Sequence, residues 1–140
     1  MRKLARGTIV FVLALATSTS ALAGPDDETG VSYDDKTVTH DCDKQGRGVN
    51  LNNKVTITLV GRCTNLIIAG TKNKVTGDVR RVGISGGSNI VDVQNVETII
   101  VTGNDNKVTF KGSFHPAKQT SVSSSGKRNT IASAPAPKRK

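Results

Sequence analysis

The chain has 140 residues, and its 20 Lys and Arg outnumber its 11 Asp and Glu, so the formal net charge at pH 7 is +9. This length provides for one modest hydrophobic core and not two. Trp is absent and aromatic residues make up 3% of the chain, which argues against a stacking platform for nucleic acid.

Residues 1–23 have the pattern of a secretory signal peptide. Arg2, Lys3 and Arg6 precede an apolar stretch from Ile9 to Ala16, and the segment ends in Ala21-Leu22-Ala23, which is typical of a signal-peptidase site. An uncleaved membrane anchor is the alternative, but the apolar stretch is shorter than the roughly 20 residues of a span. We therefore expect export to the periplasm or the extracellular space, with no transmembrane span in the mature form.

The segments before and after the central region differ from it in composition. Residues 24–36 are acidic and polar, which predicts a flexible lead-in, and residues 133–140 are rich in Ala and Pro and end in Lys138-Arg139-Lys140, which predicts a disordered basic tail. A single domain from 37 to 132 lies between them. Cleavage after Ala23 removes three cations and leaves a net charge of +6.

Two cysteines, Cys42 and Cys63, are present. In an oxidising compartment such a pair predicts one disulfide. A metal site is the alternative, because His40 stands two residues before Cys42, but no second pair of ligands at the usual spacing completes a tetrahedral set. We expect no metal and no cofactor.

The central region is repetitive. The string Asn-Lys-Val-Thr occurs at 53–56, 73–76 and 106–109, a looser copy occupies 89–92, and residues 129–131 are a candidate fifth copy. Gly stands three residues before the Asn in four of these copies. Apolar and polar residues alternate around each Asn, which is the pattern of short strands.

This repeat predicts an all-β fold, a short parallel β-solenoid of about four to five coils, in which stacked coils bury a continuous core. We expect an inward-pointing asparagine at one turn of each coil, and hence a ladder of hydrogen-bonded amides. The expected members of the ladder are Asn53, Asn73, Asn89 and Asn106. A small antiparallel sandwich is the alternative, although it gives no reason for one turn chemistry to recur. Residues 120–131 are left open as a fifth coil.

The region from Cys42 to Phe110 resembles the bacterial exported proteins of the DUF3060 family. The resemblance rests on Cys42, on the runs 53–59 and 61–63, and on the Gly-to-Val segments 70–75 and 103–108. It implies export and a β-rich fold. It implies no activity and no site residues.

The acids of the repeats do not form a catalytic set. Asp78, Asp92, Glu97 and Asp105 stand at different offsets from their repeat Asn, so stacking does not bring two of them together for acid–base chemistry. We therefore expect a non-enzymatic protein. A hydrolase or lyase acting on polysaccharides is the alternative.

Three lysines share one offset in the repeats. Lys54, Lys74 and Lys107 each follow the repeat Asn, and strand alternation predicts that they point outward in one column. Such a column is a candidate site for an anionic glycan or an anionic cell-envelope polymer. The alternative is a solvated edge that prevents aggregation between sheets. The expected function is a structural or binding role at the cell envelope, and the oligomeric state stays open.

Overall fold

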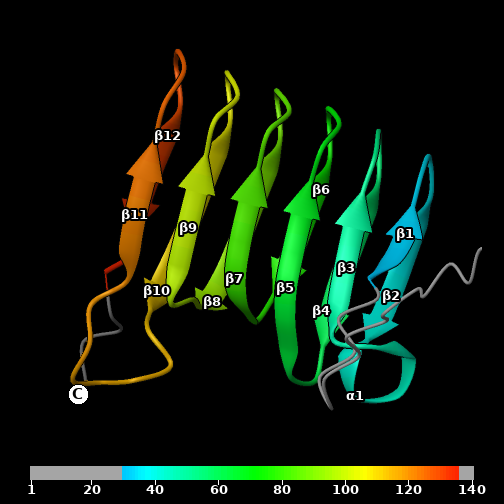
Figure 1. Ribbon diagram of the computed structural model, residues 1–140, viewed down its shortest axis with the longest axis horizontal. Coiled ribbons are helices and arrows are strands. Elements are labelled where there is room, and N and C mark those ends of the chain that lie inside the picture. The colour runs from blue at the N-terminus through cyan, green and yellow to red at the C-terminus, as the bar shows by residue number, and fades with distance from the viewer. Residues whose placement is uncertain (1–29, 136–140) are drawn as a thin grey trace, which may run out of the picture.

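The computed structural model describes residues 30–135. The expected signal peptide, residues 24–29 of the lead-in and residues 136–140 of the tail lie outside the described residues. Within 30–135 the chain forms two parallel six-stranded sheets, and in Figure 1 the strands of one sheet lie side by side in the order in which the chain reaches them. The predicted all-β solenoid is thereby confirmed.

Successive strands alternate between the two sheets. The first sheet contains β1 (Val31–Tyr33), β3 (Gly48–Leu51), β5 (Cys63–Ile68), β7 (Val79–Ile84), β9 (Thr98–Val101) and β11 (Ser121–Ser124). The second contains β2 (Thr37–Asp41), β4 (Thr56–Val60), β6 (Lys74–Gly77), β8 (Ile90–Asn95), β10 (Lys107–Gly112) and β12 (Thr130–Ser133). One short helix, α1 (Cys42–Gln45), connects β2 to β3.

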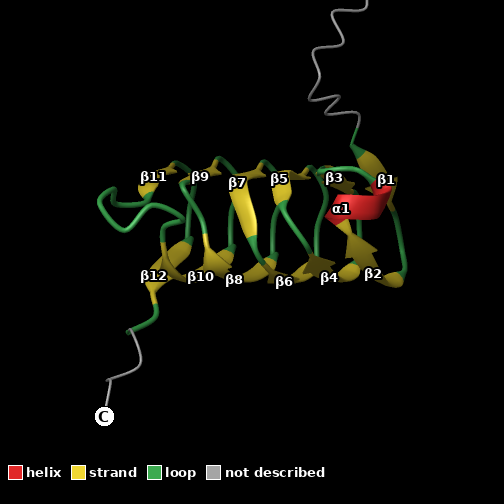
Figure 2. Cartoon of the chain, turned by 90° about the horizontal axis from the view of Figure 1, so that it is seen from below, coloured by secondary structure: helices red, strands yellow, loops and turns green. Residues whose placement is uncertain are grey.

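Each strand of the first sheet and the next strand of the second make one coil, so coil 1 is β1 with β2 and coil 6 is β11 with β12. The two sheets form two layers in Figure 2. The turn from the first sheet to the second is called the asparagine corner below, and the connection back to the first sheet is called the return corner. Every coil pairs only with its neighbours, as a solenoid requires.

The core is filled by alternate strand residues. In the second sheet one inward column runs through all six coils, and its members in chain order are Val38, Ile57, Val75, Val91, Val108 and Ile131. The first sheet contributes a matching column of Val31, Val49, Leu66, Val82, Ile99 and Val122. Val122, in the last coil, is exposed, and burial of the other apolar side chains on parallel strands is the main contribution to stability.

Coil 1 differs from the sequence prediction, because β1 lies inside the segment expected to be a flexible lead-in. Its residues pair with β3, and Tyr33 packs against the core. The Tyr33 hydroxyl also lies 2.8 Å from Nδ1 of His40, which is fully buried at the core position beside Leu59. Backbone pairing and this buried contact order a stretch whose composition is polar.

Coil 6 resolves the question that the sequence left open, because residues 121–133 form a further coil. Two of its inward positions are polar: Ser124 pairs with Val101, and Ser133 pairs with Phe110. A polar last coil covers the end of the apolar core, as terminal repeats of solenoids commonly do. No helix in residues 30–135 is long and apolar enough to span a membrane.

Candidate functional site

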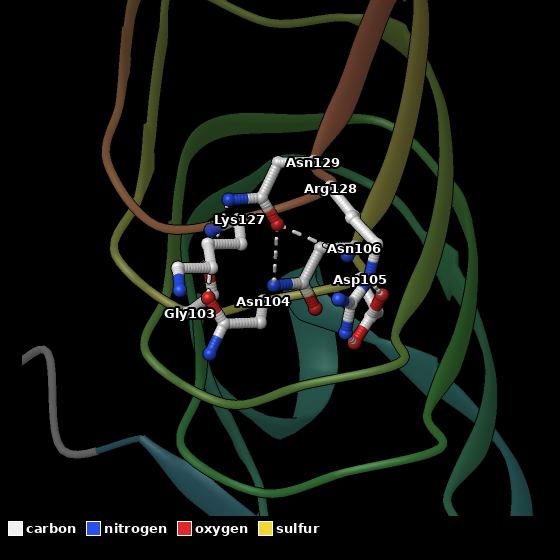
Figure 3. A network of polar contacts seen from close by, with 7 residues as sticks. All are labelled: Gly103, Asn104, Asp105, Asn106, Lys127, Arg128 and Asn129. Atoms are coloured by element: carbon white, nitrogen blue, oxygen red, sulfur yellow. Dashed lines mark hydrogen bonds and ion pairs between the residues drawn. The ribbon is translucent and has the colours of Figure 1, made fainter.

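A ladder of asparagines runs along the asparagine corner. Asn73, Asn89 and Asn106 are buried, and Asn129 of coil 6 continues the column. Oδ1 of Asn89 accepts hydrogen bonds from the backbone N–H and the side-chain amide of Asn73, at 3.0 and 2.9 Å. The same pair of bonds joins Asn89 to Asn106 and Asn106 to Asn129, the last of which Figure 3 shows.

The recurring glycines explain how the ladder closes. Each of Asn89, Asn106 and Asn129 also donates from Nδ2 to the carbonyl of a glycine one coil earlier. These glycines stack along the corner, and at Gly86 or Gly103 a Cβ would overlap the carbonyl of the glycine below. Thus the ladder satisfies buried polar groups that would otherwise be costly, and its role is structural.

Asn53 does not belong to this ladder, which corrects the sequence prediction. In coil 2 the register places Val55 in the column, and the N–H of Val55 donates to Oδ1 of Asn73 at 2.8 Å. Asn53 is exposed and accepts from the backbone of Thr71. The first Asn-Lys-Val-Thr string is therefore displaced by two residues relative to the other copies.

The predicted lysine column is wrong for the same reason. Lys74 and Lys107 share one register column, but Ile90 lies between them on β8. Lys54 lies two residues before Thr56, which is the residue that pairs with Lys74, so it stands at the turn and in another column. The three ammonium groups therefore do not line up along one face.

The disulfide between Cys42 and Cys63 is confirmed, with Cα atoms 5.1 Å apart. It ties α1 to the start of β5. His40 does not compete for a metal, because Nδ1 contacts Tyr33 and Nε2 lies 2.7 Å from the carbonyl oxygen of Gly46. In residues 30–135 no group of three or more His, Cys, Asp or Glu side chains could hold a metal ion.

A cleft of about 340 Å³ opens at the return corner, next to this disulfide. It is lined by basic and aromatic side chains from four coils, together with one acid. The lining residues are Arg47, Arg62, Cys63, Thr64, Arg80, Glu97, Phe114 and His115. This arginine cleft brings more cationic side chains together than the lysines of the repeats do.

Stacking places the arginine cleft's charged groups. Arg47, Arg80 and Glu97 each stand one residue before positions that pair in register on β3, β7 and β9. They therefore share one column at the beginning of these strands, in which Thr64 of β5 stands between Arg47 and Arg80. Arg62 stands one residue before β5 and forms an ion pair with Asp43 of α1, with Nε 3.5 Å from Oδ1.

The loop of residues 113–120, between β10 and β11, also lines the arginine cleft. In Figure 2 this loop extends past β11 and β12 at the end of the solenoid. It carries Phe114, which is 42% exposed, and His115, whose Nε2 lies 3.1 Å from Oε1 of Glu97. The loop thus forms one wall of the cleft.

Glu97 links Arg80 and His115 across the cleft. Its Oε2 accepts a hydrogen bond of 2.7 Å from Nε of Arg80, and its Oε1 faces His115. The hydrogen bond from Arg80 lowers the pKa of the Glu97 carboxyl, the positive charges of Arg80, His115 and Arg81 act in the same direction, and partial desolvation opposes them. Glu97 is therefore an ionised bridge between a strand and the loop.

Sequence reasoning missed the arginine cleft. A signal was nevertheless present, since Arg47, Arg62 and Arg80 each stand at or just before the start of a strand of the first sheet. Their offsets from the repeat Asn vary, because the return corner changes in length from coil to coil. Phe114 and His115 come from a loop that carries no repeat.

The family model of DUF3060, described as a protein of unknown function, matches residues 74–128. This match confirms the resemblance that the sequence indicated, although it begins and ends later than the region from Cys42 to Phe110. It extends from β6 to the last asparagine corner and includes Arg80, Glu97 and the loop that carries His115. No curated protein and no solved structure matches the chain.

Proposed function

We propose that this DUF3060-type solenoid is an exported, non-enzymatic binding protein of the cell envelope, and that it holds an anionic glycan or envelope polymer in the arginine cleft. The observation that carries the proposal is the convergence of Arg47, Arg62 and Arg80 on one cleft lined by a single carboxylate, that of Glu97. The proposal replaces the lysine column with a site in which the cations do face a common space.

The chemistry of the cleft suits carboxylate or phosphate groups on a ring-bearing polymer. A guanidinium group presents a planar fork of donors that matches either anion. The Arg62 side chain is 83% exposed and that of Arg80 is 49% exposed, so a ligand can reach both. Phe114 adds an apolar surface on the loop, against which the less polar face of a sugar ring can pack.

Binding is favoured over hydrolysis by the state of Glu97. General acid–base cleavage of a glycosidic bond uses two carboxyl groups that flank the bond. Both oxygens of Glu97 are already engaged, one by Arg80 and the other by His115. A carboxylate held in this way by Arg80 and His115 is suited to keeping the cleft in shape.

Export is supported by two features. The first 23 residues have the pattern of a signal peptide, and the Cys42–Cys63 disulfide is typical of an oxidising compartment. The net positive charge of the chain would favour association with the anionic polymers of an envelope.

The test is a binding titration with an oligogalacturonate as the carboxylate probe and neutral dextran as the control. The variant that removes the cleft cations is Arg62→Gln with Arg80→Gln. Its matched control is Lys74→Gln with Lys107→Gln, which removes the same charge from the outer face of the second sheet. We expect the arginine variant to lose affinity about tenfold or more and the lysine variant to lose less than about threefold.

The basic tail needs its own control, since a cationic tail can hold a polyanion without a folded site. A variant that ends at Ser133 removes Lys138, Arg139 and Lys140 and should retain most of the affinity. Equal losses in the arginine and lysine variants, or loss of binding on truncation alone, would contradict the proposed site.

A further inference from the structure

The Glu97 bridge contains one imidazole, a group of the type that ordinarily titrates near neutral pH. Glu97 binds Arg80 through Oε2 and His115 through Oε1, so a single carboxylate divides its charge between a permanent cation and a titratable imidazole. The His115 side chain is 56% exposed and can exchange protons with solvent. Histidine is the side chain that ordinarily titrates in this range, at about pH 6.5.

The bridge also determines where one wall of the cleft stands. The loop of residues 113–120 is held at its far end by a 2.8 Å hydrogen bond from Oγ1 of Thr120 to the carbonyl of Val96. Inside the loop, the N–H of Lys118 donates to the carbonyl of His115 at 2.9 Å. The contact of His115 with Glu97 then fixes the loop against β7 and β9, with Phe114 facing the cleft.

We propose that anion binding in the arginine cleft is coupled to protonation of His115, so that the protein captures its ligand more tightly as the pH falls. This rests on the proposed function, because it concerns the regulation of the same site. The proton acts in two ways. It adds a positive charge at the cleft, and it strengthens the bridge that positions the loop.

The charges around His115 define the sign of the effect. Glu97 faces it from the turn before β9, Arg80 and Arg81 belong to β7, and Lys118 lies in its own loop. Arg47 and Arg62 line the cleft that His115 borders. When the imidazole is neutral, Glu97 is directed mainly to Arg80 and offsets its charge.

When the imidazole is protonated, it shares the negative charge of Glu97 with Arg80. More of the positive potential of Arg80 is then available to a ligand. By linkage, a bound anion must in turn favour the protonated imidazole to the same degree. The cleft would therefore bind its anionic ligand more tightly in an acidic environment and release it in a neutral one.

Two histidines in the chain make the coupling measurable at one residue. His40 is fully buried, and both of its ring nitrogens are engaged inside the protein, whereas His115 is exposed at the cleft. The NMR signals of the two imidazoles can be followed separately through a pH titration. His40 then serves as an internal reference for the fold.

The experiment measures the affinity for an oligogalacturonate at constant ionic strength from about pH 5 to pH 8. The carboxyl groups of the probe stay ionised over this range, because they titrate at about pH 3.5. We expect binding to be about fivefold tighter at the acidic end. The titration midpoint of His115 should move to higher pH when the probe is saturating, and the NMR signals of His40 should be unaffected by the probe.

The variant His115→Gln keeps a hydrogen-bond donor for Glu97 but cannot gain a proton, so its affinity should be independent of pH over this range. An unchanged pH dependence in this variant, or a His115 midpoint that ignores the probe, would overturn the coupling and leave the binding proposal standing. Absence of binding at every pH would instead overturn the proposed function. The two failures are therefore distinguishable.

Discussion

Lys54 and Lys72 occupy equivalent positions on neighbouring coils, and both have a left-handed backbone, with φ values of 53° and 60°. Each stands one residue before the asparagine column, so the conformation belongs to the corner and not to the residue type. Every coil repeats it, with φ between 43° and 60°. The six residues are Asp35, Lys54, Lys72, Ser88, Asp105 and Arg128.

The first prediction follows from this conformation, because residues with a Cβ are strained in it and none of the six is a glycine. The variant Lys72→Gly should be about 0.5–1 kcal/mol more stable than the wild type, after allowing for the greater freedom of glycine in the unfolded chain. Denaturant unfolding measures the difference. The control is Lys74→Gly on β6, which should be destabilised, and stabilisation in both variants would contradict the argument.

A second prediction compares the stability cost of replacing Asn89, a member of the ladder, with that of replacing Asn53, which has the same sequence motif but lies outside the ladder. In Asn89→Ala, the amide of Asn73 and the carbonyl of Gly70 lose buried hydrogen-bond partners, so we expect a loss of about 1–3 kcal/mol. In Asn53→Ala, the exposed N–H of Thr71 can bond to water, and the loss should stay below about 1 kcal/mol. Similar unfolding midpoints for the two variants would show that burial does not distinguish them.

The third prediction concerns the disulfide, which closes a loop with a sequence separation of 21. Replacing both Cys42 and Cys63 by Ser should lower the free energy of unfolding by about 2–4 kcal/mol, mainly because the unfolded chain gains freedom. Unfolding of the variant beside the oxidised wild type measures the loss. Addition of a reductant should lower the stability of the wild type and leave the variant unchanged, and any other pattern would count against the bond.

The fourth prediction is a response to acid in the last two coils. Two hydrogen bonds from Arg128 reach Asp105 one coil earlier, and that from Nη2 to Oδ2 measures 2.8 Å (Figure 3). These bonds lower the pKa of Asp105. Its folded pKa is thus below its unfolded one, so the stabilisation is present above about pH 4 and is lost as the pH falls through the folded value.

The variant Arg128→Gln removes this stabilisation and should show a smaller loss of stability between neutral and strongly acidic pH. Glu97 and Asp41 also have lowered pKa values, because Arg80 and Lys44 respectively bond to their carboxylates. Both groups remain in the variant, so a reduced acid sensitivity is expected and not its abolition. Thermal unfolding at a series of pH values measures the response, and identical curves would exclude a contribution from the pair.

The repeat alone was enough to predict the solenoid, because the spacing of Gly, Asn and Val repeats the geometry of one corner. The same Asn-Lys-Val-Thr string at 53–56 led to the wrong prediction that Asn53 belongs to the ladder. There, strand alternation was correct, but the register with the next coil could not be read from one coil in isolation. Only pairing between coils distinguishes Val55 in the column from Asn53 outside it.

Coil 1 was missed for a related reason. It has no Asn-Lys-Val-Thr string, and its order depends on pairing with β3 and on the buried contact between Tyr33 and His40. These partners are not visible in the composition of residues 24–36. At the other end, Asn129 did carry the repeat signal, and coil 6 formed around it.

The arginine cleft was not predicted, because its members meet only through the stack. Arg62 and His115 are far apart in the sequence, and no shared offset connects them. The return corners differ in length, so an arginine at one corner cannot be aligned with the next by its distance from an asparagine. A cleft formed across coils is a property of the register, which the repeat did not specify.

The contact of each coil with only its neighbours has a consequence for how this architecture can change over generations. Gain or loss of one complete period of 16 or 17 residues near the middle would add or remove one rung of amides and leave the corners above and below intact. A shift of one or two residues would break the ladder instead. Length in such a lineage is therefore expected to vary in whole coils, with the first and last coils kept as the ends.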